Sequence, residues 1–114
     1  MLADNIFLKI IDKQIPAQIV YEDDRCLAFR DINPQAPVHV LIIPRRVIAT
    51  HDAIQDGDKD LLGHLHLAAA KIAQQLGLAD GYRLVVNCRE RAGQTVPHLH
   101  MHLLGGREMT WPPG

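Results

Sequence analysis

The sequence predicts an α+β fold in which an antiparallel five-stranded sheet carries one long and one short helix. Strand-prone runs follow one another without helical crossovers, which implies antiparallel pairing. Apolar residues recur at helical spacing in one long stretch of the second half and in one short stretch near the start. The 114 residues suffice for one hydrophobic core, so we expect a single domain spanning 1–114.

The first half of the chain predicts the short helix and three strands. Asp4 or Asn5 can cap a helix over 6–11, and Pro16 prevents its continuation. A polar turn, and then a loop with two prolines, separate the strand-prone runs that follow. These runs lie at 19–21, 26–30 and 38–43.

The second half predicts the long helix and two further strands. Apolar residues recur at helical spacing from about 58 to 76, and Gly77 suits the position just after the helix end. Strand-prone runs then occupy 82–87 and 98–104, and Gly105-Gly106 ends the second of them.

The composition, with 47% hydrophobic and 22% charged residues, is that of an ordinary soluble globular protein. The net charge of −1 argues against a nucleic-acid partner, because binding a phosphate backbone needs clustered Lys and Arg. No apolar stretch is long enough to span a bilayer, and the first residues lack the features of a secretory leader. We therefore expect a cytoplasmic protein without a membrane partner, with Cys26 and Cys88 as reduced thiols.

Three histidines alternate with apolar residues in the last predicted strand. Successive side chains of a strand point to opposite faces, so His98, His100 and His102 share one face. Leu99 and Met101 lie on the other face and can pack on a core. Three imidazoles on one face of a half-buried strand therefore need an explanation.

Three explanations are open. In the first, the rings bind zinc with His39 as a fourth ligand, although three alternate residues converge on one ion only if the strand bends. In the second, they are surface residues without a shared role. In the third, they perform catalysis, because a neutral imidazole attacks phosphorus at neutral pH and neighbouring rings move protons. We favour the third and expect neither a metal nor a cofactor.

The run His98-Leu99-His100-Met101-His102-Leu103-Leu104 resembles the signature of the histidine triad (HIT) superfamily, in which histidines alternate with apolar residues. The similarity covers nearly the whole chain and is strongest to the Hint branch, the nucleoside phosphoramidate hydrolases. The terminal Trp111-Pro112-Pro113-Gly114 is especially specific to that branch. The other similar segments are Asp4-Asn5-Ile6-Phe7, Lys9-Ile10-Ile11, Tyr21–Pro37, Leu62-Gly63-His64-Leu65, Gly81-Tyr82-Arg83, Val85-Val86-Asn87, Gly93-Gln94 and Leu104–Gly114.

The resemblance implies roles for four histidines. His100 would attack the α-phosphorus and become nucleotidylated, with its other ring nitrogen bonded to backbone near His98. His102 would contact the phosphate and the leaving-group atom, and His39 would lie on the phosphate side. His98 alone is equally consistent with a satisfied core histidine. We expect His51, His64 and His66 to be surface or packing residues.

The resemblance also implies a purine nucleotide site. Asp31 would accept hydrogen bonds from the ribose, and an apolar slot would hold the base with weak discrimination between adenine and guanine. Thr95 stands where serine is common in the family, and its hydroxyl is kept. Pro97 stands where an aromatic residue is common, and this difference affects the expected preference for the leaving group. The charged run 88–92 is either a solvated loop or a contact for a bulky leaving group. The implied substrate-binding residues are Ile6, Phe7, Ile10, Phe29, Asp31, Ile32, Asn87, Gly93, Gln94, Thr95, Met101 and Trp111.

The implied activity is hydrolysis of purine nucleoside 5′-monophosphoramidates through a nucleotidyl-histidine intermediate. The alternatives are hydrolysis of dinucleoside polyphosphates or other nucleotidyl anhydrides, and a purine-nucleotide-binding scaffold protein. The resemblance further implies a homodimer that joins two sheets into one. The long helix and the strand before it would form its interface, and the tail around Trp111 would reach the partner's active site.

Overall fold

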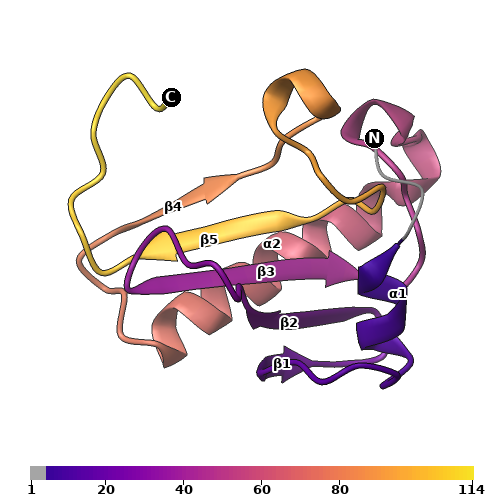
Figure 1. Ribbon diagram of the computed structural model, residues 1–114, viewed down its shortest axis with the longest axis horizontal. Coiled ribbons are helices and arrows are strands. Elements are labelled where there is room, and N and C mark those ends of the chain that lie inside the picture. Colours follow the sequence, from indigo (N-terminus) through magenta and orange to yellow (C-terminus); the bar gives the residue numbers. More distant parts are fainter. Residues whose placement is uncertain (1–4) are drawn as a thin grey trace.

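A computed structural model describes residues 5–114 as a twisted sheet with a helix on each face (Figure 1). The five strands are all antiparallel and have the order β1-β2-β3-β5-β4, which confirms the predicted fold class. The elements are α1 (Ile6–Ile11), β1 (Ile19–Glu22), β2 (Cys26–Arg30), β3 (Val38–Pro44), η1 (His51–Ala53), η2 (Asp56–Asp58), α2 (Lys59–Gln75), β4 (Tyr82–Val85), η3 (Glu90–Ala92) and β5 (Met101–Gly105).

The two faces of the sheet bury separate apolar clusters. The long helix α2 covers one face, where its residues Leu65, Ala69 and Ile72 pack on Ile42 and Leu103. The short helix α1 covers part of the other face, in a smaller cluster. That cluster comprises Phe7, Ile10, Leu27, Phe29, Leu41, Ile43 and Val96. Because α1 has only six residues, much of this second face lies beyond its reach.

The helix ends follow the local chemistry of the chain. The Asn5 side chain caps α1 by accepting hydrogen bonds from the backbone N–H groups of Phe7 and Leu8, as predicted for one of the two candidates. The other candidate, Asp4, lies outside the described residues. At the end of α2, Gly77 has φ +74°, the left-handed conformation that glycine adopts without strain.

The last strand is shorter than predicted. It begins at Met101 instead of His98, because its pairing with β3 starts at Met101 opposite Ile42. The segment before it makes irregular backbone bonds, from Leu99 N–H to the Ile48 carbonyl and from His98 N–H to that of Val96. The predicted strand 82–87 likewise ends early, at Val85.

The expected dimer joins two sheets through the strand before the long helix, but that strand does not lie at an edge of the sheet. The strand before the long helix is β3, which is hydrogen-bonded on both sides and has no free edge. The edge strands are β1 and β4, and β4 is the strand that follows the long helix. In the part of the chain that the structure describes, no helix has the length and apolar character needed to cross a membrane.

Candidate active site

A cavity of about 340 Å³ opens on the face of the sheet that carries α1. This volume falls within the usual range of small-ligand sites. The cavity brings together nine of the predicted site residues from four separate segments of the chain. These are Ile6, Phe7, Ile10, Phe29, Asp31, Ile32, Thr95, His100 and His102.

His98 is fully buried and faces away from this cavity. Its Nε2 lies 2.7 Å from the carbonyl oxygen of Pro44, so Nε2 carries the hydrogen and donates it. Its Nδ1 lies 3.0 Å from Nδ2 of Asn5 and accepts. Both ring nitrogens are therefore occupied, and His98 is a satisfied core histidine whose ring cannot touch substrate.

His100 has one ring nitrogen bonded and one available. Its Nδ1 lies 2.7 Å from the carbonyl oxygen of His98, as the family resemblance implies. Since a carbonyl only accepts, Nδ1 carries the hydrogen and Nε2 keeps a lone pair. The ring is 6% exposed, and the edge-to-face contact with Phe7 at 5.0 Å holds its plane. This arrangement fits a nucleophile that attacks through Nε2.

His39 and His102 form a second hydrogen-bonded pair. The Gln35 backbone N–H donates to Nδ1 of His39, so the hydrogen of that ring is on Nε2. This Nε2 lies 2.9 Å from Nδ1 of His102, which must accept. The remaining nitrogen of His102, Nε2, therefore carries a hydrogen and is the atom that can donate to a ligand. Asp31 lies nearby, with Oδ2 3.5 Å from Nε2 of His39.

Burial keeps all four rings neutral at neutral pH. It lowers the pKa of His39, His98 and His100 below the usual value of 6.5, and for His100 it outweighs the bond to the His98 carbonyl and the charge of Asp31. Burial, with His100 and His39 as neighbours, lowers the pKa of His102 to about 4. A neutral His100 is the reactive form, because protonation would occupy the lone pair on Nε2.

Beside the histidines, the cavity is lined by apolar side chains that form a slot. Phe7 and Phe29 meet edge to face with ring centroids 5.5 Å apart. Ile32 is 99% exposed at the rim and Ile6 is 44% exposed, although both are large apolar side chains. An aromatic base inserted between these residues would cover surface that the protein itself leaves in water.

Two predicted binding residues have roles in the interior instead. Gln94 is buried, and its side chain accepts from the Arg89 N–H and donates to the carbonyls of Ala49 and Val96, so this side chain holds the surrounding loops together. Met101 lies on the opposite face of β5, in the core beneath α2, because its neighbours His100 and His102 occupy the cavity side.

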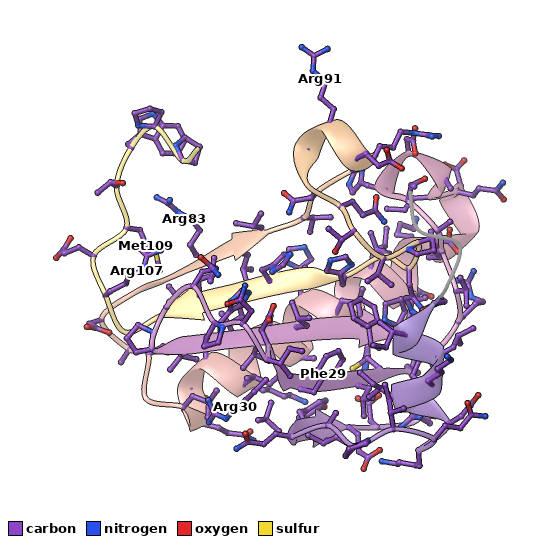
Figure 2. All side chains as sticks on the ribbon, in the orientation of Figure 1. Phe29, Arg30, Arg83, Arg91, Arg107 and Met109 are labelled. Carbon is purple, nitrogen blue, oxygen red and sulfur yellow. The ribbon has the colours of Figure 1, made fainter. Side chains whose placement is uncertain are left out.

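Other predicted contacts lie outside the cavity. Gly93, with φ +96°, sits beside Asn87, whose Nδ2 would be 3.9 Å from a Cβ at that glycine. The charged run 88–92 includes η3, from which Arg91 projects away from the sheet (Figure 2). Trp111 belongs to the tail that leaves the sheet at the end of β5 remote from α1 (Figure 1).

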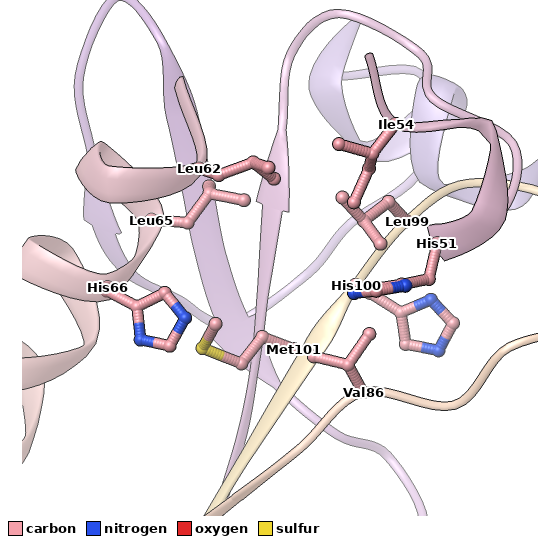
Figure 3. Close-up of a pocket in the computed structure, with 9 residues that line it drawn as sticks. All are labelled: His51, Ile54, Leu62, Leu65, His66, Val86, Leu99, His100 and Met101. Atoms are coloured by element: carbon pink, nitrogen blue, oxygen red, sulfur yellow. The ribbon is translucent and has the colours of Figure 1, made fainter. Parts of the chain in front are cut away.

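A smaller cavity of about 110 Å³ lies on the α2 side of β5 (Figure 3). His100 lines both cavities, and in this one it lies beside His51, while His66 lies beside Met101. The remaining wall is apolar and includes Leu62 and Val86. Its lining includes His51, His66 and His100 but no carboxylate, whereas the larger cavity combines His100 and His102 with Asp31, so we assign the site to the α1 side.

Metal ligation by all three triad histidines conflicts with the geometry, because both nitrogens of His98 point into the protein. Within residues 5–114, two other groups place three ligand atoms within 4.8 Å of one another. In each group hydrogen bonds already join ligand atoms, between His39 and His102 and between His64 and Asp23. The groups are Asp31, His39 and His102, and Asp23, Cys26 and His64.

Sequence reasoning missed the second role of Asn5 and the network around Asp23. A helix-cap pattern predicts that Asn5 accepts from backbone but gives no sign that its amide reaches His98, 93 positions away. Asp23 and His64, 2.7 Å apart, join the β1–β2 turn to α2 and come from segments 41 positions apart. Such long-range partners leave no local pattern in one sequence.

The fold and the site together define a small α+β protein with a neutral histidine cluster in a ligand-sized cavity. The chain belongs to the HIT domain family, whose profile matches residues 12–109. It is 57% identical over 114 residues to an uncharacterized HIT-like protein of Synechocystis, and the match covers all of both chains.

Solved structures agree with this assignment. A HIT family hydrolase from Legionella pneumophila is 54% identical and superposes with a TM-score of 0.95, over 97% of this chain and 100% of that one. A histidine triad nucleotide-binding protein from Candida albicans is 33% identical with a TM-score of 0.82, over 96% of this chain and 83% of that one.

Proposed function

We propose that the protein hydrolyses purine nucleoside 5′-monophosphoramidates to a nucleoside monophosphate and an amine. The observation that carries the proposal is the assignment of hydrogens around the cavity. His100 presents a lone pair on Nε2, and His102 presents an Nε2–H, both within one site. The name of the Candida relative supports a nucleotide as ligand.

In the proposed reaction, Nε2 of His100 attacks the α-phosphorus as the bond from phosphorus to the amine nitrogen breaks. The resulting phospho-imidazolium keeps its Nδ1–H on the His98 carbonyl, which stabilises the positive ring. The departing nitrogen takes up a proton from solvent and leaves as the neutral amine, while the Nε2–H of His102 hydrogen-bonds to it. Water then attacks the phosphorus, the bond from phosphorus to Nε2 of His100 breaks, and the water proton returns to solvent as the nucleoside monophosphate is released.

The remaining residues of the cavity supply binding. Phe7, Phe29 and Ile32 would hold the base by burial and stacking, which explains weak selection between purines. Asp31 is placed between this slot and the His39–His102 pair, where a carboxylate can accept from ribose hydroxyls. Thr95 is exposed at the cavity and can donate its hydroxyl to the phosphate. The proposal includes a cytoplasmic setting, supported by the free thiols of Cys26 and Cys88.

Turnover of two substrates tests this assignment. We expect kcat/KM for adenosine 5′-monophosphoramidate to exceed that for diadenosine triphosphate by roughly 100-fold or more, because one small amine fits beside His102. The measurement is nucleotide release followed by chromatography. A preference for the triphosphate would assign the protein to the anhydride hydrolases, and tight AMP binding without turnover of either would indicate a nucleotide-binding scaffold.

We further propose a homodimer formed through α2 and the free edge of β4. Large apolar side chains are exposed along this surface and on the tail, which the protein leaves uncovered. The exposed fractions are 64% for Leu67, 42% for Tyr82, 38% for Val86 and 82% for Trp111. Pairing of two β4 strands would join two sheets into one, and each tail could then reach the partner's cavity.

Light scattering at micromolar concentration tests the dimer. We expect a mass near twice the 12.7 kDa of the chain, and a monomeric mass for the double variant Leu67→Glu/Val86→Glu, which puts one charge on α2 and one on the residue directly after β4. Val47→Glu is the control, since Val47 is 44% exposed and lies outside α2 and β4. A monomeric wild-type protein would contradict the proposal.

A further inference from the structure

The carbonyl that orients the proposed nucleophile belongs to an irregular stretch of backbone. His98 lies three residues before β5, so no strand pairing fixes its position. The distance from this carbonyl to Nδ1 of His100 is nevertheless short, at 2.7 Å. Because a hydrogen bond weakens steeply when its geometry is lost, something else must hold residue 98 in place.

The ring of His98 is held from two sides. Pro44, the last residue of β3, accepts from Nε2 at 2.7 Å, and Nδ2 of Asn5 donates to Nδ1 at 3.0 Å. The orientation of the Asn5 amide is fixed independently, because its Oδ1 accepts from the N–H groups of Phe7 and Leu8. Its NH₂ group must therefore face His98. Phe7 packs against the same ring, with centroids 5.9 Å apart.

We propose that Asn5 is a positioning residue for catalysis, which holds His98 as a neutral ring hydrogenated on Nε2 and thereby fixes the carbonyl that orients His100. An amide donor facing Nδ1 repels a second hydrogen on that nitrogen. A neutral His98 places no positive charge beside the nucleophile. One asparagine thus joins the start of α1, which lines the base slot, to the backbone behind His100.

The inference rests on the proposed function for its kinetic effect, but its structural part can be tested without turnover. Two variants separate capping from positioning. Asn5→Ser keeps a capping oxygen but is too short to reach His98. Asn5→Asp keeps the cap and replaces the NH₂ donor by a carboxylate oxygen, which should draw a hydrogen onto Nδ1 of His98 and make the ring cationic.

The experiment combines ¹⁵N-histidine NMR at neutral pH with steady-state kinetics on adenosine 5′-monophosphoramidate. In the wild-type protein we expect neutral His98 with hydrogen on Nε2, and His100 with hydrogen on Nδ1. In Asn5→Asp we expect both nitrogens of His98 protonated, a shifted His100 Nδ1–H signal and kcat lower by about 10- to 100-fold. In Asn5→Ser we expect kcat lower by about 10-fold with KM within about threefold of wild type.

A residue that only caps α1 would give a different result. Both variants keep a cap, so both would then retain the wild-type histidine signals and kcat, and the inference would be overturned. A cationic His98 in the wild-type protein would overturn it as well. If the wild-type protein showed the expected signals but no turnover, the proposed function would fail while the structural role of Asn5 would stand.

Discussion

Replacing His100 with alanine is expected to lower kcat for adenosine 5′-monophosphoramidate by roughly 10⁴-fold, because no other ring offers a lone pair in the cavity. The Nε2 atoms of His98 and His102 both carry hydrogen, and the Nε2–H of His39 is directed at His102. The loss should appear in kcat, since the base slot and Asp31 remain. Nucleotide affinity, measured by calorimetry with AMP, should change by less than about threefold.

Mass spectrometry of rapidly quenched wild-type protein provides the direct measurement. A nucleotidyl adduct should be found on the peptide that contains His100, and none should form in His100→Ala. His102→Ala is the informative comparison, because it keeps the nucleophile and removes only the donor. An adduct on His102, or near-normal turnover by His100→Ala, would show that the nucleophile is misassigned.

Replacing Asp23 with alanine is expected to lower the free energy of unfolding by about 3 kcal/mol. Its carboxylate accepts from the backbone N–H groups of Arg25 and Cys26, from Tyr21 Oη–H at 3.1 Å and from His64 Nε2 at 2.7 Å. Partial burial would raise the pKa of Asp23, but these donors outweigh it and hold the pKa well below its usual range. Alanine leaves them without their acceptor.

Thermal and urea denaturation measure this loss. A change of that size corresponds to a midpoint roughly 10–15 °C lower in a domain of this length. Asp24→Ala is the matched control, because Asp24 is exposed on the same turn, and we expect it to change stability by less than about 0.5 kcal/mol. Equal effects of the two substitutions would show that the network contributes little.

The elements were predictable because local patterns determine them. The helical spacing of Leu61, Leu65, Ala69 and Ile72 encodes α2, and Gly77 marks its end, within a residue or two of the observed bounds. The start of β5 was not predictable, since alternation continues through His98 although pairing with β3 does not. The pairing ends where β3 ends. There the Pro44 carbonyl accepts a hydrogen bond from the His98 side chain instead of from a backbone N–H of the last strand.

In the candidate site, too, some residues follow from local sequence patterns and others depend on distant partners. His100, His102 and the residues of the base slot could be proposed from the sequence because a signature and an apolar pattern point to them, and these residues line one cavity in the structure. Gln94 and Met101 were predicted to bind substrate, but the Gln94 side chain bonds within the protein and Met101 packs beneath α2, since chain proximity to the histidines does not reveal which side chains turn inward. The bond from Asn5 to His98 was missed because capping of α1 already accounts for an asparagine at position 5, and nothing in the local sequence points to a second partner.

Main-chain groups place hydrogens on the four histidine rings, and the Asn5 amide is a second partner of His98. The His98 carbonyl fixes His100, the Pro44 carbonyl fixes His98, and the Gln35 N–H fixes His39 and through it His102. Since every residue other than proline carries both groups, the side chain at position 35 is free to vary while the chain keeps its path. A deletion of one residue in the loop 31–37 would move the Gln35 N–H and leave all four histidines present but wrongly protonated. The protonation of this site therefore depends on the length of the loop 31–37 more than on the side chain at position 35.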